Sequence, residues 1–243
     1  MAEPIIRARN IDKVYRSTAT PVHALRDVSL DVARGEMVAV MGPSGCGKTT
    51  LLNCLSGLDS IDGGQVTIEG RDIGSLSDDE LSDYRARRMG FVFQTFNLLP
   101  VLSAVENVEL PLLLAGTPAD AARAAAIDRL TMVGLADRNN HTPAELSVGQ
   151  RQRVAIARSL ANDPAIVWAD EPTGNLDSEN ERDVMDLLER LNREHGQTFV
   201  IVTHSDVVGA RAHRIVRMRD GAIEREAADR TADERTGGPA PER

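Results

Sequence analysis

One short segment constrains the fold of this chain more than any other. It reads Gly42-Pro43-Ser44-Gly45-Cys46-Gly47-Lys48-Thr49 and satisfies every fixed position of the pattern G-x-x-x-x-G-K-[ST]. The apolar residues at 38–41 precede it as a short buried strand, and Leu51, Leu52 and Leu55 follow at helical spacing. A strand, a glycine-rich turn and a helix in this order predict a phosphate-binding loop. The plain alternative is a glycine-rich turn before an amphipathic helix.

The residue types explain how such a loop holds a phosphate. Glycines let successive backbone N–H groups turn inward, and the next helix directs its partly positive N-terminus at the same anion. Lys48 then reaches the β- and γ-phosphates, and the Thr49 hydroxyl holds Mg²⁺. Of the 28 Lys and Arg residues only Lys13 and Lys48 are lysines, so a compact ammonium stands where the loop needs one. The expected nucleotide-binding residues of the loop are Gly42, Ser44, Gly45, Cys46, Gly47, Lys48, Thr49 and Thr50.

Composition and charge exclude several classes of function. The 243 residues are 42% hydrophobic and 27% charged, which is ordinary for a soluble protein of one large or two small domains. The net charge of −9 argues against nucleic acid as a partner. Apolar runs are too short to span a bilayer, and no signal peptide is expected. Cys46 and Cys54 lie too close together for a useful disulfide and lack metal-ligand company, which fits a reducing cytoplasm.

Strands are expected on both sides of the loop. Alternating patterns at 5–14, 22–32 and 65–69 predict a small antiparallel sheet beside the nucleotide core. Tyr15 ends the first of these strands, and we expect its ring to stack on an adenine, although a lone aromatic is more often core filler. Asp220-Gly221 marks a hairpin turn near the end of the chain. Further strands are expected at 89–94, 165–169 and 198–203, the last two buried.

Helices are expected between these strands. Capping boxes beginning at Ser77 and Ser178 start two of them, and Gly196 stops the second. A third helical region should be broken at Pro111 and again at Gly116. The expected helical ranges are 77–88, 103–138, 147–161 and 178–195.

Polar side chains stand where three buried strands end, namely Gln94, Asp170 with Glu171, and His204. Ligands of a parallel α/β sheet bind beyond the carboxyl ends of its strands, so these side chains should converge on the phosphate loop. We expect Asp170 and Thr49 to hold Mg²⁺, and Glu171 to orient and deprotonate the attacking water. Gln94 would reach the metal or that water, and His204 the γ-phosphate. Each of these side chains alone is weak evidence of function, but together with the phosphate loop they predict a nucleoside triphosphatase.

The order of these motifs resembles the ATP-binding subunit of ABC transporters over nearly all of residues 5–226. The segment Leu146-Ser147-Val148-Gly149-Gln150 is similar to the Leu-Ser-Gly-Gly-Gln signature of that family, which other phosphate-loop NTPases lack. Asp177 matches the aspartate after which the family's D-loop is named. Tyr15, Gln94 and His204 match its adenine-stacking aromatic, its Q-loop glutamine and its switch histidine. The segments most similar to the macrolide-export and lipoprotein-release branch are 91–100, 106–116 and 170–178.

The resemblance implies an ABC ATPase fold in the α/β class. Its phosphate-loop (RecA-like) core carries an N-terminal antiparallel β-subdomain and an α-helical subdomain inserted at about 96–162, all within one domain over 1–226. The polar, Gly- and Pro-rich stretch at 227–243 predicts a disordered tail. The resemblance also implies ATP and Mg²⁺ as ligands, with ATP hydrolysis coupled to transport by a separate membrane permease. Such a subunit is cytoplasmic and peripheral on the inner face of the cell membrane.

The resemblance further implies a homodimer that sandwiches two ATP molecules head to tail. In the family the signature of one subunit covers the nucleotide of the other, so Ser147, Gly149, Gln150 and Asp177 should contact ATP across the dimer. Val148 departs from the pattern, because the family usually has a glycine there. A β-branched residue is strained at positive φ, so the match requires a negative φ at this position.

The groove after the Q-loop receives a coupling helix of the permease in the family. The apolar residues of 96–110, Leu99 among them, are therefore expected either to pack internally or to form a docking surface. One alternative function is a soluble ABC-type ATPase not coupled to transport, but the double cassettes or coiled-coil insertions of such proteins are not evident here. The other alternative function is a kinase built on the same phosphate loop, but a kinase would not account for the signature-like segment 146–150.

Overall fold

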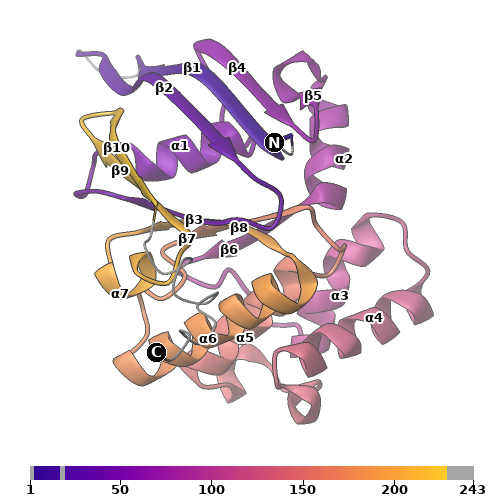
Figure 1. Ribbon diagram of the computed structural model, residues 1–243. Helices are drawn as coiled ribbons and strands as arrows, with labels where there is room; N and C mark the ends of the chain where they lie inside the picture. The colour runs from indigo at the N-terminus through magenta and orange to yellow at the C-terminus, as the bar shows by residue number, and fades with distance from the viewer. Residues whose placement is uncertain (1–2, 17–19, 229–243) are drawn as a thin grey trace, which may run out of the picture.

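The computed structural model describes residues 3–16 and 20–228, and it contains two sheets. The larger has six strands in the order β10-β9-β3-β8-β7-β6 (Figure 1). Neighbouring strands run parallel from β9 through to β6, and β10 pairs antiparallel with β9. The strand bounds are β3 Met37–Met41, β6 Met89–Phe93, β7 Ile166–Asp170, β8 Thr198–Thr203, β9 Arg214–Arg219 and β10 Ala222–Ala228.

The central strands of this sheet are buried on both faces. Every residue of β3 and β8 is buried. Successive side chains alternate between two cores, so that Val38 and Val40 face one while Ala39 and Met41 face the other. Strands covered on both faces read as continuous apolar runs, which is why the sequence pattern located them correctly.

A second, four-stranded antiparallel sheet covers one face of the first. Its order is β2-β1-β4-β5, and helix α1 (Lys48–Leu55) lies between the two sheets (Figure 1). Leu51, Leu52 and Leu55 of α1 enter the core that both sheets share. The strand bounds are β1 Ile6–Tyr15, β2 Val22–Val32, β4 Gly63–Ile68 and β5 Arg71–Asp72. The predicted antiparallel β-subdomain is confirmed.

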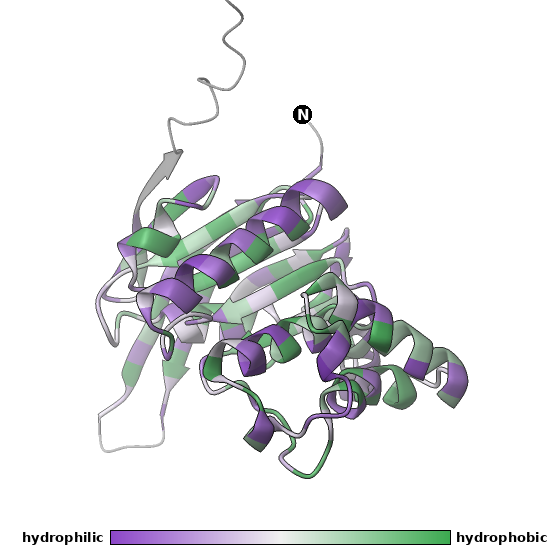
Figure 2. Cartoon of the chain, turned by 90° about the horizontal axis from the view of Figure 1, so that it is seen from below, coloured by the Kyte–Doolittle hydropathy of each residue, from purple (hydrophilic) through white to green (hydrophobic). Residues whose placement is uncertain are grey.

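Helices cover the opposite face of the central sheet. Helix α6 (Ser178–His195) packs there through Val184, Leu187, Leu188 and Leu191, as its periodicity predicted. Coloured by hydropathy, the chain shows hydrophobic stretches along its strands and mixed residues along its helices (Figure 2). The other helices are α2 Asp78–Arg88, α3 Ala104–Leu114, α4 Ala119–Met132, α5 Val148–Ser159 and α7 Asp206–Gly209, with single 3₁₀ turns at Ile73–Ser75, Ala136–Arg138 and Pro143–Glu145. None of the helices in the described ranges combines the length and the hydropathy needed to cross a bilayer.

Three local expectations were wrong. Helix α3 continues through Pro111, because burial of Val105, Val108 and Leu112 outweighs the backbone hydrogen bond that proline removes. The cap of α6 is Asp177, whose carboxylate accepts from the Asn180 N–H, and not the predicted capping box at 178–181. Strand β10 pairs with β9 as far as Ala228, beyond the predicted start of the tail at 227. The rest of that tail, 229–243, lies outside the described residues.

Candidate nucleotide-binding site

The phosphate loop joins β3 to α1, and backbone atoms of β2 and β9 pack tightly against it. A Cβ at Gly42 would lie 2.2 Å from the backbone oxygen of Met218 in β9. Gly47 has a φ of 102°, and a Cβ there would lie 2.5 Å from the backbone oxygen of Ala24 in β2. Both positions therefore require glycine. The backbone N–H of Gly221, in the β9–β10 turn, donates to the Cys46 carbonyl at 3.0 Å, so the hairpin braces the loop.

Lys48 lies at the base of this loop and is buried. Its ammonium donates to the carbonyl oxygens of Gly42 at 2.8 Å and Pro43 at 2.9 Å. An ammonium has three N–H donors, so one is left to meet an anion in the loop. The first turn of α1, which begins at Lys48, holds no acidic residue, and its N-terminal N–H groups make the same end of the helix attractive to a phosphate.

A pocket of about 550 Å³ opens beside the loop and is lined by Tyr15, Gly45, Thr49 and Thr50 among others. The Tyr15 ring is 38% exposed, and its hydroxyl donates to Asp59 at 2.7 Å. Its position thus fits the expected stacking residue better than core filler. Burial is the largest cause that raises the pKa of Tyr15, and the Asp59 carboxylate raises it further, so the ring stays neutral at pH 7.

Asp59 in turn is held by Lys13. Lys13 is buried, and its ammonium donates to the other Asp59 oxygen at 2.7 Å and lies 5.1 Å from the centroid of the Tyr15 ring. Sequence reasoning missed this pair. The one available signal was the scarcity of lysine. Lys48 lies in the phosphate loop, and Lys13, the other lysine of the chain, lies next to Tyr15.

Thr49, in the phosphate loop, and Asp170, at the end of β7, are in contact. The Thr49 hydroxyl donates to Oδ1 of Asp170 at 3.2 Å. Burial raises the pKa of Asp170, with the Glu171 charge adding to the effect and the Thr49 hydrogen bond opposing it. A carboxylate whose charge is disfavoured in this way gains from a nearby cation.

Glu171 and His204 meet at the ends of neighbouring strands. His204 Nδ1 lies 2.8 Å from Oε1 of Glu171. Glu171 has a φ of 47°, and its N–H donates to the Val202 carbonyl, which ties the turn after β7 to β8. Within the described residues the second carboxylate oxygen of Glu171 has no hydrogen-bond partner, so it is free to accept a proton.

Gln94 follows β6 and lies against the segment after Glu171. A Cβ at Gly174 would lie 2.9 Å from Nε2 of Gln94, and Asn175 Nδ2 donates to the Gln94 carbonyl at 2.8 Å. No hydrogen bond among the described residues joins Gln94 to Thr49 or Asp170. The expected contact of Gln94 with the metal or the attacking water thus stays a prediction.

The signature residues form a separate surface at the N-terminus of α5. Ser147 and Gln150 make a reciprocal capping box, in which the Gln150 N–H donates to the Ser147 hydroxyl at 3.2 Å. Val148 is the first helical residue and is not among the non-glycine residues with positive φ, so the strain anticipated there is absent. A Cβ at Gly149 would lie 2.1 Å from Oδ1 of Asn180, which gives a packing reason for this glycine.

Asp177 belongs to the same surface, since it caps α6 and its carboxylate also accepts from the Asn180 amide at 3.0 Å. None of the hydrogen bonds in the described part of the chain links Ser147, Gly149, Gln150 or Asp177 to the phosphate loop. The predicted site residues therefore form two separate groups in this chain. The first contains the loop, Tyr15 and the strand ends, and the second contains the signature helix and Asp177.

Comparisons with known proteins agree with this geometry. The sequence profile of the ABC transporter family matches residues 25–174. The uncharacterized ABC transporter ATP-binding protein MJ0796 of Methanocaldococcus jannaschii is 46% identical over 235 residues, covering 95% of this chain and 100% of that protein. A solved dimeric structure of the cassette MJ0796, in a post-hydrolysis state bound to ADP and Pi, has a TM-score of 0.85 at 44% identity and covers 93% of this chain and 99% of that one.

Longer relatives also match. The macrolide export ATP-binding/permease protein MacB 1/2 of Paracoccus denitrificans is 48% identical over 237 residues, which is 98% of this chain but 34% of that protein. The chain thus spans about a third of the length of such relatives. The motifs, the two-sheet fold and these matches agree, and the chain belongs to the ABC transporter family as an ATP-binding cassette.

Proposed function

We propose that this cassette binds ATP with Mg²⁺, hydrolyses it as a homodimer, and drives a membrane permease. The hydrogen bond between Thr49 and Asp170, directly above Lys48 in the phosphate loop, is the observation that carries the proposal. A glycine-rich turn that served only for packing would not need a buried ammonium and a half-buried carboxylate beside it. The relative MJ0796, solved with ADP and Pi, supports the same reaction.

ATP would lie with its base on the Tyr15 ring and its phosphates in the loop. The loop residues proposed for this contact are Gly42, Ser44, Gly45, Cys46, Gly47, Lys48, Thr49 and Thr50. Backbone N–H groups and the start of α1 supply most of the attraction, and Lys48 adds a full charge at the base.

Thr49 and Asp170 fit Mg²⁺. This ion prefers oxygen ligands and is usually bound by one or two carboxylates together with substrate phosphates and water. Their two oxygens lie 3.2 Å apart, and the Asp170 carboxylate lies where burial disfavours an uncompensated charge. When bound, the ion neutralises charge on the β- and γ-phosphates. Gln94, which follows β6 and lies beside Gly174, would be a further ligand of the ion or of the attacking water.

Glu171 would act as the general base for the attacking water. Its free oxygen is within the same group of strand ends as Asp170, and His204 holds the other oxygen. This contact fixes the carboxylate rotamer, which matters because a base must lie within hydrogen-bond reach of the proton that it removes. His204 is exposed and so can also contact the γ-phosphate once the site closes.

A second subunit would complete the site. The capped N-terminus of α5 leaves N–H groups and the Ser147 hydroxyl available for an anion, yet it is separate from the loop of its own chain. Two chains placed head to tail would bring Ser147, Gly149, Gln150 and Asp177 of each over the ATP of the other. The dimeric structure of MJ0796 supports the formation of a dimer.

The partner of this dimer would be a permease. Relatives named as macrolide export ATP-binding/permease proteins carry about two thirds of their length beyond the part that matches this chain. The cassette would then lie in the cytoplasm, held at the inner face of the membrane through that permease. Exposed Leu99 and Val101, shortly after Gln94, supply apolar surface for docking.

Phosphate release by the purified chain tests the enzymatic part. We expect ATP hydrolysis that stops when Mg²⁺ is chelated and falls by about 10²-fold or more in Lys48→Ala, because the loop loses its charge compensation. Arg87→Ala is the matched control, since it removes an exposed cation of α2 and should leave the rate unchanged. Hydrolysis by Lys48→Ala at the wild-type rate would overturn the proposal.

A further inference from the structure

Glu171 and His204 both lie in short segments that follow a strand. Glu171 is the first residue after β7, and His204 is the first residue after β8. Glu171 has a φ of 47°, which a non-glycine residue keeps only where its surroundings hold it. The 2.8 Å contact between the two side chains therefore depends on what holds the two segments in place.

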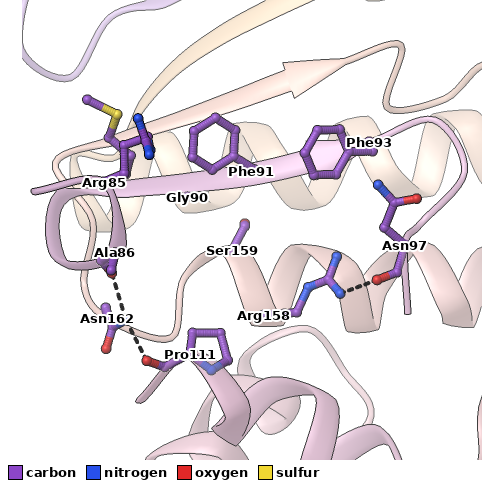
Figure 3. A pocket seen from close by; sticks show the side chains of 11 residues that line it. Arg85, Ala86, Gly90, Phe91, Phe93, Asn97, Pro111, Arg158, Ser159 and Asn162 are labelled. Atoms are coloured by element: carbon purple, nitrogen blue, oxygen red, sulfur yellow. Dashed lines mark hydrogen bonds between the residues drawn. The ribbon is translucent and has the colours of Figure 1, made fainter. Parts of the chain in front are cut away.

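Helices hold the segments that follow β6, β7 and β8, and they do so in different ways. The segment after β6 is held from α5. Figure 3 shows Arg158 directed toward Asn97, whose carbonyl oxygen accepts one of its N–H groups, and the Phe96 carbonyl accepts another at 2.8 Å. The segments after β7 and β8 are both held from α6, and through one shared side chain, that of Glu181.

Glu181 lies in the first turn of α6, and a single oxygen of its carboxylate accepts two hydroxyl groups. Thr173, two residues after Glu171, donates to Oε1 at 3.2 Å. Ser205, directly after His204, donates to the same oxygen at 2.9 Å. A carboxylate oxygen can accept both hydrogen bonds, because it has two lone pairs. One side chain of α6 thus joins the segment that carries Glu171 to the segment that carries His204.

The contacts of Glu181 are not those of a helix cap. In α2 and α3 a glutamate of the first turn, Glu80 or Glu106, accepts from the backbone N–H of the N-cap residue of its own helix. Helix α6 is capped by Asp177 instead. Among the described residues, the hydrogen bonds to the Glu181 side chain come only from outside α6. Capping therefore does not explain them.

The two hydroxyl groups that Glu181 accepts are themselves fixed. Thr173 is buried. The Ser205 hydroxyl oxygen also accepts from the Val208 N–H at 3.4 Å, and the Ser205 N–H donates to the buried Thr203 hydroxyl at 3.0 Å. Loss of the Glu181 carboxylate would leave a buried hydroxyl of Thr173 without its acceptor, so the segment would shift to find another.

We propose that Glu181 is a positioning residue for ATP hydrolysis, which holds Glu171 and His204 in alignment with each other. The proposal rests on the function proposed above and adds a residue that would not touch the nucleotide. Displacement of a reacting group by about 1 Å can cost on the order of 10²-fold in rate. Gln152 of α5 separately donates to the Pro172 carbonyl, so loss of Glu181 should loosen this segment without releasing it. We therefore expect a smaller effect, of about tenfold.

Steady-state ATP hydrolysis gives the first test. Glu181→Ala should lower kcat about tenfold and leave KM for ATP within about twofold, because the proposed contacts with ATP lie elsewhere. Glu181→Gln should stay within about threefold of the wild-type kcat, since its amide oxygen can still accept both hydroxyl groups. Glu179→Ala, an exposed carboxylate in the same turn, is the matched control and should leave the rate unchanged.

A second test separates positioning from general support of the fold. It compares single-turnover hydrolysis of radiolabelled ATP by Glu171→Gln and by Glu171→Gln/Glu181→Ala. Without the carboxylate of Glu171 no base remains to be aligned, so the second substitution should change the residual rate by less than about twofold. A tenfold loss in both backgrounds would overturn the assignment, because it would show that Glu181 does not act through Glu171.

Thr173→Val tests the route through the hydroxyl group. It should lower kcat about threefold on its own and have no further effect in Glu181→Ala, because both substitutions break the same contact. Independent losses that multiply in the double variant would overturn this route. Absence of hydrolysis in the wild type would overturn the proposed function and this assignment with it. A Glu181→Ala variant with the wild-type kcat would overturn this assignment alone.

Discussion

His204 Nδ1 lies 2.8 Å from Oε1 of Glu171, and this contact joins the ends of two neighbouring strands. The Glu171 side chain is 17% exposed, whereas that of His204 is 70% exposed. The histidine is therefore free to move away from the carboxylate without disturbing the core. In its proposed role as general base, Glu171 would thus be oriented before the nucleotide arrives.

Glu171→Gln should bind ATP normally and hydrolyse it about 10²–10⁴-fold more slowly, because an amide keeps the shape of the side chain but cannot take a proton from water. Bound ATP should then hold two chains together, so size-exclusion chromatography with ATP and Mg²⁺ should show a dimer. Glu179→Gln, on the exposed first turn of α6, is the control. A Glu171→Gln variant that stays monomeric would contradict the head-to-tail arrangement.

Asp59→Asn should weaken ATP binding and leave the chemical step nearly unchanged. Its carboxylate holds both the Tyr15 hydroxyl and the Lys13 ammonium, so its loss frees the stacking ring. We expect KM for ATP to rise about fivefold with kcat within about twofold, since stacking contributes on the order of 1 kcal/mol. Tyr15→Ala should show at least the same rise. An effect in Tyr15→Ala without one in Asp59→Asn would show that Asp59 does not position the ring.

Gly149→Ala should lower the free energy of unfolding by about 1–3 kcal/mol, the usual cost of overpacking. The added methyl group would meet Oδ1 of Asn180, which is fixed by its contact with Asp177. The double variant Gly149→Ala/Asn180→Ala, in which the Asn180 side chain is shortened, should recover part of the lost free energy of unfolding. Urea denaturation can measure this difference. Equal instability of the single and double variants would mean that the clash lies elsewhere.

Glu69→Gln should destabilise the protein in a pH-dependent manner. A bidentate hydrogen bond from Arg88 lowers the pKa of Glu69 to about 2, and Arg34 adds to the effect. Because the pKa is lowered in the folded state, the stabilisation is present above pH 4.5 and is lost as the pH falls toward 2.

Urea denaturation of wild type and Glu69→Gln should therefore differ by about 1–2 kcal/mol at pH 7, after allowance for solvent screening, and by much less at pH 3. Asp79→Asn is the comparison, since Asp79 is an exposed carboxylate in the first turn of α2. A difference for Glu69→Gln that does not shrink at low pH would mean that the carboxylate charge is not the source.

Leu99→Asp should uncouple the cassette from the proposed permease and leave ATP binding intact. The side chain is 44% exposed, so a charge there should cost little folding free energy. In cells, the fraction of the protein that sediments with membranes should fall several-fold. Ile127→Asp, at a 37% exposed position on α4, is the control. Unchanged membrane association of Leu99→Asp would place the docking surface elsewhere.

The sequence was sufficient for features with short-range causes. The phosphate loop follows from its own residue types, and the continuous apolar run at 198–203 marks a strand buried on both faces. The Asp220-Gly221 turn, with φ values of 47° and 83°, follows from the preference of hairpin turns for these residues.

Features with long-range causes could not be predicted in this way. Nothing near Pro111 indicates that packing of α3 against α4 and α5 carries the helix through it. Asp177 and Ser178 are both good cap residues, and the choice between them depends on where the preceding turn ends. Lys13 and Asp59 form an ion pair although they lie 46 residues apart in the sequence, so no local sequence pattern connects them.

The bracing of the phosphate loop has a consequence for how the protein is made. Strand β3 pairs with β8 and β9, and the loop that follows it is supported by Gly221, all of which emerge from the ribosome after most of the chain. The nucleotide cradle is encoded early and yet cannot take its final shape until synthesis is nearly complete. A nascent chain that stalls before residue 221 would carry the loop's sequence without a formed cradle. The chain should therefore bind ATP only once the C-terminal hairpin has been made and has folded.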